Sequence, residues 1–283
     1  MKMMKIALVQ LNTVLGGLEK NLERHLEYIE QARAAGADLV LFPELSLTGY
    51  FLQDLALEVA LDPYNSPQFA QLLQAAQGID VMPGFVQVDE RGRYSIATAY
   101  LSQGQIVHVH HKTYLPTYTI FDDKRFFTPG NQVRAFDTRF GRMGMLICED
   151  YWHISIPYLL WMDGADLFLC QAASPGHGLS PAAELDSVRL VETMLTTYAN
   201  LFTSAFAYTN RVGYEDGLNF PGGGLMIDAA GAVSARAGCE EGMTLVELDL
   251  DQTARRRFSL PLLRDERPEL VLRELERILG ERA

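Results

Sequence analysis

Three residues whose types suit nucleophilic chemistry each follow a short, strand-like run of this sequence. The runs are residues 39–43 before Glu44, 106–111 before Lys112 and 143–147 before Cys148. Short apolar runs bounded by polar residues are typical of buried strands. We therefore expect a carboxylate, an amine and a thiol at three strand ends, where they could converge on one pocket.

The position of Cys148 favours a reactive thiol. Glu149 and Asp150 follow it directly, and a helix is predicted a few residues later. The start of a helix offers unpaired backbone N–H groups and the positive end of a dipole, which favour a thiolate and could stabilise an oxyanion. A cysteine in an apolar strand is more often a small core residue. Cys170, within residues 167–170, is expected to be one.

The chemistry of acyl transfer gives the other two residues a role. A thiol with the ordinary pKa of about 8.5 is mostly protonated at neutral pH, so it needs a base. Glu44 could be that base if burial raises its pKa. The Lys112 ammonium and the backbone N–H of Glu149 would then stabilise the oxyanion. A Cys–His pair using His153 or His177 is the alternative, although neither histidine lies in a papain-like local signature.

Strands and helices alternate around these residues. Strands are predicted at 5–11, 38–43, 79–88, 93–102, 105–111, 143–148, 166–172, 202–209, 223–229 and 243–249, and helices at 18–35, 66–76, 153–163 and 181–200. Residues 113–130 form a long loop rich in Pro, Tyr and Asp, and loops of this length are often functional. The order of elements predicts two mixed sheets packed face to face with helices outside.

Composition restricts the classes of partner. The 283 residues are 48% hydrophobic and carry a formal net charge of -12, which disfavours a nucleic-acid surface. No apolar run approaches the roughly 20 residues that span a bilayer, so no membrane association is expected. The three cysteines are widely spaced and no signal peptide is evident, which favours a cytoplasmic protein. Metal-binding motifs are missing from the sequence, so no metal and no cofactor are expected.

The three motifs resemble those of the nitrilase, or carbon–nitrogen hydrolase, superfamily. They are FPELSLTGY around Glu44, HKTYLPTY around Lys112 and LICEDYW around Cys148. The resemblance extends from residue 4 to about residue 250. Within the superfamily the sequence is most similar to the glutaminase domain of glutamine-dependent NAD synthetase, through residues 115–118, 121–127, 148–150 and 210–213.

The resemblance implies a four-layer α-β-β-α sandwich and a Glu–Lys–Cys triad. It also implies a homodimer or a higher even oligomer. Many members carry a second glutamate in the loop after the lysine, and Asp123, which is one methylene shorter, occupies that position here. The positions that match substrate-holding groups are Tyr50, Tyr118 and Ser174, and we add Trp152 near the nucleophile. We expect residues 1–250 to form the hydrolase domain and residues 251–283 a C-terminal arm that packs on the domain or on a partner subunit.

The function expected from the resemblance is hydrolysis of a carbon–nitrogen bond in a small amide through a cysteine thioester, with release of ammonia or an amine. Because the sequence shows no synthetase domain after residue 250, the ammonia would pass to a separate NAD synthetase or be released. Other hypotheses remain open: an N-carbamoyl amidase or nitrilase, acyl transfer to an amine, and a non-hydrolytic binding protein on the same fold. The intact triad argues against the last of these.

Overall fold

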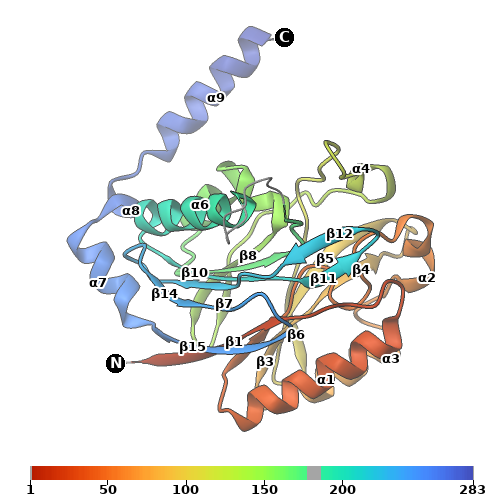
Figure 1. The fold of residues 1–283 in the computed structure, drawn as a ribbon. Helices are drawn as coiled ribbons and strands as arrows, with labels where there is room; N and C mark the ends of the chain where they lie inside the picture. The colour runs from red at the N-terminus through yellow and green to blue at the C-terminus, as the bar shows by residue number, and fades with distance from the viewer. Residues whose placement is uncertain (1, 177–185, 283) are drawn as a thin grey trace.

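Two β-sheets pack face to face in this computed structural model, which describes residues 2–176 and 186–282 (Figure 1). In the first sheet, β1, β2 and β3 are parallel, and the remaining neighbours pair antiparallel. Across this sheet the order is β15 (Gly242–Asp249), β1 (Met3–Gln10), β2 (Leu39–Leu41), β3 (Asp80–Met82), β5 (Tyr94–Ser102) and β4 (Gly84–Val88), with β6 (Gln105–His111) also paired to β5.

The second sheet has a similar mixed arrangement, with β8, β9 and β10 parallel. Its order is β14 (Val233–Arg236), β13 (Leu225–Ile227), β10 (Ala205–Asn210), β9 (Leu167–Ala172), β8 (Gly141–Ile147) and β7 (Phe136–Thr138). A separate two-stranded ribbon pairs β11 (Val212–Glu215) with β12 (Leu218–Pro221).

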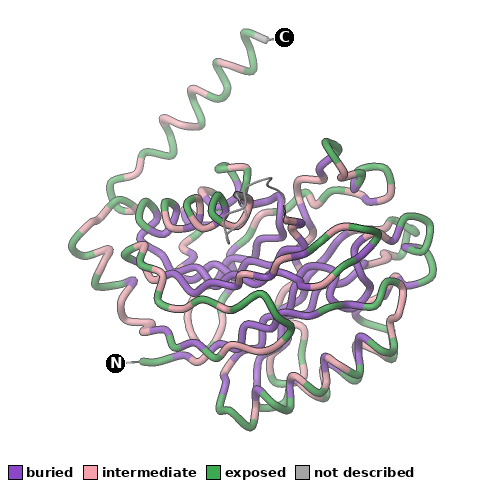
Figure 2. The backbone as a smooth tube through the Cα atoms, viewed as in Figure 1, coloured by how far each residue is buried: buried purple, intermediate pink, exposed green. Residues whose placement is uncertain are grey.

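The core lies in the layers between these elements. Alternate residues of β1 pack in two different layers of the core, because successive side chains of a strand point to opposite faces. Ile6 and Leu8 pack between the sheets with Met145 and Leu169 of the second sheet. Ala7 and Val9 belong instead to the cluster that packs the first sheet against helices. Figure 2 shows the buried backbone concentrated in the two sheets.

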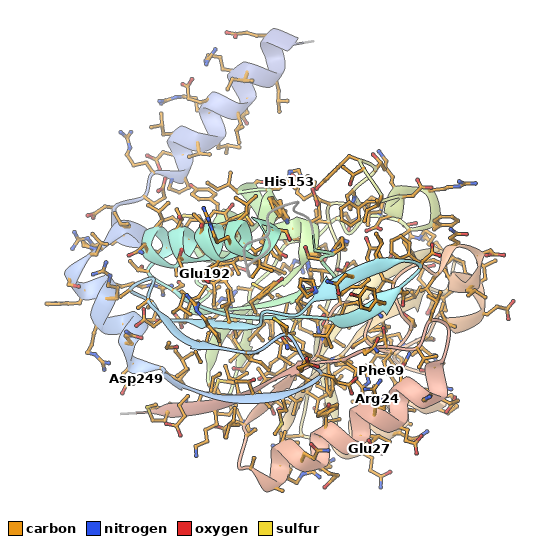
Figure 3. The ribbon with its side chains drawn as sticks, viewed as in Figure 1. Arg24, Glu27, Phe69, His153, Glu192 and Asp249 are labelled. Carbon is orange, nitrogen blue, oxygen red and sulfur yellow. The ribbon has the colours of Figure 1, made fainter. Side chains whose placement is uncertain are left out.

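Helices cover both outer faces. α1 (Leu18–Ala34) and α3 (Pro67–Ala75) lie on the outer side of the first sheet, and α5 (Ser155–Met162) and α6 (Asp186–Phe202) on that of the second. Figure 3 labels Arg24 and Glu27 on the side of α1, and His153 and Glu192 on the opposite side. The expected α-β-β-α sandwich is therefore confirmed.

Several local boundaries differ from the expected ones. Residues 79–88 are two strands, because Pro83 lacks an N–H group and separates β3 from β4. The loop at 113–130 contains a short helix, α4 (Asp123–Phe126). A 3-10 turn, η2 (Cys148–Trp152), precedes α5. The remaining short elements are η1 (Gln53–Leu55) and α2 (Ala56–Val59).

The chain after residue 250 forms three helices within the described residues: α7 (Asp251–Ser259), α8 (Leu262–Asp265) and α9 (Pro268–Arg282). α7 packs on the second sheet, where Arg257 donates hydrogen bonds to Asp166 and to the carbonyl of Ala165. α9 projects away from the rest of the chain and is largely exposed (Figures 1 and 2). Among the helices of the described chain, none combines the length and apolarity needed to cross a bilayer.

Candidate active site

The ends of β2, β6 and β8 bring Glu44, Lys112 and Cys148 together in the interior. Their exposed fractions are 2%, 0% and 5%. The Lys112 ammonium donates two hydrogen bonds of 2.7 Å, one to Glu44 Oε1 and one to Asp123 Oδ2. The predicted thiol, carboxylate and amine therefore share one buried site, and Asp123 joins them despite its shorter side chain.

Further hydrogen bonds hold the Lys112 backbone and the Glu44 side chain in place. The Lys112 N–H donates to Ile96 O at 2.8 Å, and Gly130 N–H donates to Lys112 O at 2.8 Å. The second oxygen of Glu44 accepts a 2.9 Å hydrogen bond from the Ala173 N–H, which follows β9 of the other sheet. Glu44 therefore contacts groups from both sheets.

Cys148 has a left-handed backbone conformation, with a φ of 45°, and begins η2. Side chains other than glycine rarely adopt this region, and such residues are often found at active sites. Burial, followed by the Glu44 carboxylate, raises the pKa of the Cys148 thiol well above its usual value, although the Lys112 ammonium opposes the rise. The resting thiol therefore needs a proton acceptor before it can attack a substrate.

The carboxylate and the amine also have shifted pKa values. Burial raises the pKa of Glu44, although the Lys112 ammonium opposes that effect. Burial alone would lower the pKa of Lys112, but the carboxylates of Asp123 and Glu44 outweigh it and hold that pKa well above its usual value. Lys112 is thus a fixed cation, and Glu44 is a carboxylate with increased basicity, which suits a proton acceptor.

Tyr50, expected to bind substrate, is 6% exposed and donates a 2.8 Å hydrogen bond from its hydroxyl to Asp123 Oδ1. Its hydroxyl proton is therefore already engaged, and only an oxygen lone pair could contact a substrate. Tyr50 also lines a cleft of about 660 Å³ with Asp123. Further residues around this cleft are Phe51, Leu52, Gln53, Asp54, Ile120, Asp122, Arg125, Phe126, Phe127, Asp216 and Leu218.

Tyr118 connects the loop after Lys112 to the nucleophile turn. It is 51% exposed, and its hydroxyl donates a 2.8 Å hydrogen bond to Glu149 Oε2. The other oxygen of Glu149 lies 3.3 Å from His153 Nε2, and the ring of His153 stacks on Tyr114 with centroids 3.5 Å apart. His153 therefore supports the side chain of Glu149, and His177, the other histidine considered for a Cys–His pair, lies outside the described residues.

The two other expected substrate contacts lie at the margin of this group. Ser174 follows β9, and its backbone N–H donates a 2.8 Å hydrogen bond to Asn210 Oδ1. Trp152 ends η2 and is 38% exposed, and its ring centroid lies 6.3 Å from that of Tyr151. Contacts of Ser174 and Trp152 with substrate remain predictions.

Sequence reasoning missed two buried polar groups next to the site. Glu215 accepts 2.8 Å hydrogen bonds from the backbone N–H groups of Tyr50 and Phe51, and it pairs with the buried Arg211 at 2.7 Å. This pair fixes the backbone that carries the Tyr50 ring. The i, i+4 spacing of Arg211 and Glu215 was the available signal, but it does not reveal their contact with residues 50 and 51.

The second missed group is Asp150 with His110, whose Nε2 lies 2.8 Å from Asp150 Oδ2. Both side chains are buried. The signal was the second acidic residue after Cys148, which we read as part of a charged turn. As for metals, within residues 2–176 and 186–282 no three His, Cys, Asp or Glu side chains are grouped to hold an ion.

Comparison with known proteins shows a relation along most of the chain. A family model described as carbon-nitrogen hydrolase matches residues 5–258. A glutamine-dependent NAD(+) synthetase of Thermotoga maritima is 35% identical over 260 residues, covering 90% of this chain and 44% of that protein. The chain therefore spans less than half the length of this relative.

Solved structures give the same relation. A glutamine-dependent NAD+ synthetase from Acinetobacter baumannii superposes with a TM-score of 0.79 at 30% identity, covering 89% of this chain and 47% of that one. A carbon-nitrogen hydrolase from Helicobacter pylori G27 superposes with a TM-score of 0.86 at 24% identity, covering 97% and 99% of the two chains. The second likeness supports the shared fold.

Proposed function

Because the chain belongs to the carbon–nitrogen hydrolase family, we propose that it is a hydrolase that cleaves the amide bond of a small molecule and releases ammonia. The observation that carries this proposal is the buried contact of Lys112 with Glu44 and Asp123 beside Cys148. A buried ammonium and carboxylates are costly to desolvate unless they are paired. Their presence beside a thiol gives that thiol a base and a cation.

The first half of the reaction forms a thioester. Glu44 accepts the proton of the Cys148 thiol as Sγ attacks the amide carbon, and the carbonyl oxygen becomes an oxyanion. The Lys112 ammonium and the Glu149 N–H stabilise that oxyanion. When the C–N bond breaks, the proton held by Glu44 passes to the leaving nitrogen, which departs as ammonia.

The second half restores the enzyme. A water molecule gives a proton to Glu44 and attacks the thioester carbon, and the second oxyanion forms in the same position. Cleavage of the C–S bond releases the carboxylic acid, and the Glu44 proton returns to the Cys148 sulfur. Asp123 keeps the Lys112 ammonium in place in both halves, because its 2.7 Å hydrogen bond to Lys112 does not involve Glu44.

For the substrate we propose a terminal carboxamide that resembles the side chain of glutamine. The rings of Tyr118 and Tyr50 both contact Phe121, with centroids 5.6 and 6.3 Å from that of Phe121. Both hydroxyl protons bond protein carboxylates, so the two oxygens can only accept hydrogen bonds. A carboxamide offers N–H donors to such oxygens, whereas a nitrile has none. N-carbamoyl compounds and nitriles are the competing substrate classes.

A second candidate is a glutaminase that supplies ammonia to a separate NAD synthetase. The observation that favours it is the 35% identity to a glutamine-dependent NAD(+) synthetase over 260 residues. In this role, glutamine should be hydrolysed slowly by the chain alone and faster when a separate synthetase is added. A free-standing amidase should be fully active without any partner.

The test of the function is an ammonia-release screen with glutamine, asparagine, other ω-amides, N-carbamoyl compounds and nitriles. We expect ammonia from at least one terminal carboxamide and none from the Cys148→Ala variant. Lys112→Ala should abolish release, whereas His177→Ala should retain it. Release from nitriles or N-carbamoyl compounds alone would refute the substrate class, and full activity in Cys148→Ala would refute the mechanism.

A further inference from the structure

The Asp150 carboxylate, which the mechanism above does not use, joins two catalytic strand ends. It is fully buried. Its Oδ1 accepts hydrogen bonds from the backbone N–H groups of Thr113 and Tyr114 at 2.8 and 3.2 Å. Its Oδ2 accepts from the N–H of Ile147 at 3.1 Å and from His110 Nε2 at 2.8 Å. We refer to these four contacts as the Asp150 clamp.

The donors of the Asp150 clamp flank the catalytic residues. Ile147 immediately precedes Cys148, and Thr113 immediately follows Lys112. β6, which leads to Lys112, belongs to the first sheet, and β8, which leads to Cys148, belongs to the second. Strand pairing therefore does not set the separation of the two ends, whereas a single carboxylate bonded to both does.

The Asp150 clamp contains more hydrogen bonds than a helix cap requires. An acidic residue at the third position of a helix commonly accepts a hydrogen bond from the N-cap N–H, and Ile147 supplies that bond here. The other donors come from the end of β6 and the loop after it. Because a carboxylate only accepts, His110 must carry its proton on Nε2 to complete the set.

We propose that Asp150, with His110, is a positioning residue that sets the distance between the Lys112 ammonium and the Cys148 thiol. This inference rests on the proposed function, since it assigns the Asp150 clamp to the same reaction. Asp150 does not touch the reacting atoms. It acts through the backbone at residues 113 and 147, and a misplacement of about 1 Å between reacting groups can cost about 10²-fold in rate.

The test uses Asp150→Asn in the full chain, with Asp80→Asn as the matched control. Asp80 is also a fully buried carboxylate with several partners, since it accepts hydrogen bonds from Tyr100 and Ser102 at 2.7 and 2.6 Å. It lies at the start of β3, whereas the catalytic residues follow strand ends. Both variants should lose thermal stability, and only Asp150→Asn should change the chemistry.

For the amide that releases ammonia, we expect kcat of Asp150→Asn to fall about 10²-fold while KM changes less than about threefold. Asp80→Asn should keep kcat within about twofold of the unmodified chain. His110→Gln, which keeps a neutral donor of similar reach, should retain most of kcat, and His110→Phe should lose about tenfold. An unchanged kcat in Asp150→Asn would overturn the proposal, and so would an equal fall of kcat in Asp80→Asn. If Asp150→Asn does not fold, the two His110 variants decide the question, and equal kcat values in them would overturn the proposal.

A second readout does not depend on the substrate. Iodoacetamide alkylates a thiol by forming an S–C bond as iodide leaves, and peptide mapping separates Cys148 from the exposed Cys239. Loss of the Asp150 clamp should slow alkylation of Cys148 at least about fivefold, and Asp80→Asn should not. If no amide is hydrolysed, the proposed function fails, but the alkylation rate still tests the positioning role of Asp150. Equal alkylation rates of Cys148 in all variants would refute that role.

Discussion

The hydroxyl of Tyr50 donates a 2.8 Å hydrogen bond to the Asp123 carboxylate, whose other oxygen accepts a 2.7 Å hydrogen bond from Lys112. Asp123 therefore reaches Lys112 without the extra methylene of the glutamate that is usual in the family. α4, which begins at Asp123, brings its backbone close enough. Tyr50, Asp123, Lys112 and Glu44 form one continuous chain of hydrogen bonds.

The Tyr50→Phe variant should lower kcat about tenfold, because it removes a hydrogen bond from a buried carboxylate while keeping the ring. Asp123→Asn should lower kcat more strongly, since the Lys112 ammonium loses a charged partner. Steady-state kinetics with circular dichroism would check both. Tyr64→Phe is the control, because Tyr64 is 71% exposed. Unchanged kinetics in Tyr50→Phe would show that the hydrogen bond from Lys112 is enough to hold the Asp123 carboxylate in place.

The pH dependence of kcat/KM should show an acid limb set mainly by Glu44. The base must be ionised to accept the thiol proton, so activity is lost as the pH falls through the pKa of Glu44. Burial raises that pKa, which places the limb above the ordinary glutamate value of about 4.3. Since the Asp123 charge also raises it, Asp123→Asn should move the limb to lower pH. If the acid limb does not move in Asp123→Asn, the limb reports the pKa of a group other than Glu44.

A covalent acyl-enzyme on Cys148 should be detectable by intact-mass measurement during turnover. Glu44→Gln should slow both the formation and the hydrolysis of this adduct, because the thiol and then water lose their proton acceptor. The adduct should equal the acyl group of the substrate and should be absent from Cys148→Ala. An adduct on Cys239, or hydrolysis with no adduct in any variant, would contradict the thioester route.

Gly84→Ala should displace the backbone on either side of Glu44. A Cβ atom at Gly84 would lie 2.5 Å from Pro43 O and 2.6 Å from Leu45 N, the neighbours of Glu44. Contacts this short force the backbone to move, so both kcat and the melting temperature should fall. Gly238→Ala is the control, because nothing lies within 4 Å of a Cβ atom there. Equal melting temperatures in the two variants would refute the close packing.

A homodimer, or a higher even oligomer, is expected through α5 and α6. Leu159 and Leu201 on these helices are 48% and 49% exposed, and burying such side chains against a second copy is favourable. Light scattering at micromolar concentration should give twice the chain mass or a higher even multiple, and the Leu159→Glu, Leu201→Glu double variant should give a smaller mass. Leu57→Glu on α2, where the side chain is 61% exposed, should not change it. A monomeric mass for the unmodified chain would refute the expectation.

Periodic patterns and continuous apolar runs could be predicted from the sequence, and short strands of mixed polarity could not. The 18–35 helix was found because apolar residues recur on one face, and it ends where Gly36 adopts a φ of 76°. The strands at β7, β11, β12 and β14 were missed, since each spans three or four residues and lacks the continuous apolar run that identifies the equally short β2 and β13. Their existence depends on partner strands and not on local composition.

The same distinction holds for the site. Glu44, Lys112 and Cys148 were predicted because each follows a recognisable strand-like run. Asp150 and Glu215 were not, because their roles come from contacts with residues distant in the sequence. Glu215 holds the backbone of residues 50 and 51. No local pattern contains that information.

The left-handed backbone of Cys148 lowers the thermal stability of the fold at the residue that carries the nucleophile. This conformation costs an L-residue about 1–2 kcal/mol, whereas glycine adopts it freely. Cys148→Gly should therefore unfold at a higher temperature than Cys148→Ala, although both lack the nucleophile. Residue 148 thus bears a backbone strain that the position of the nucleophile requires, and glycine would relieve that strain only in a chain that has lost its reaction.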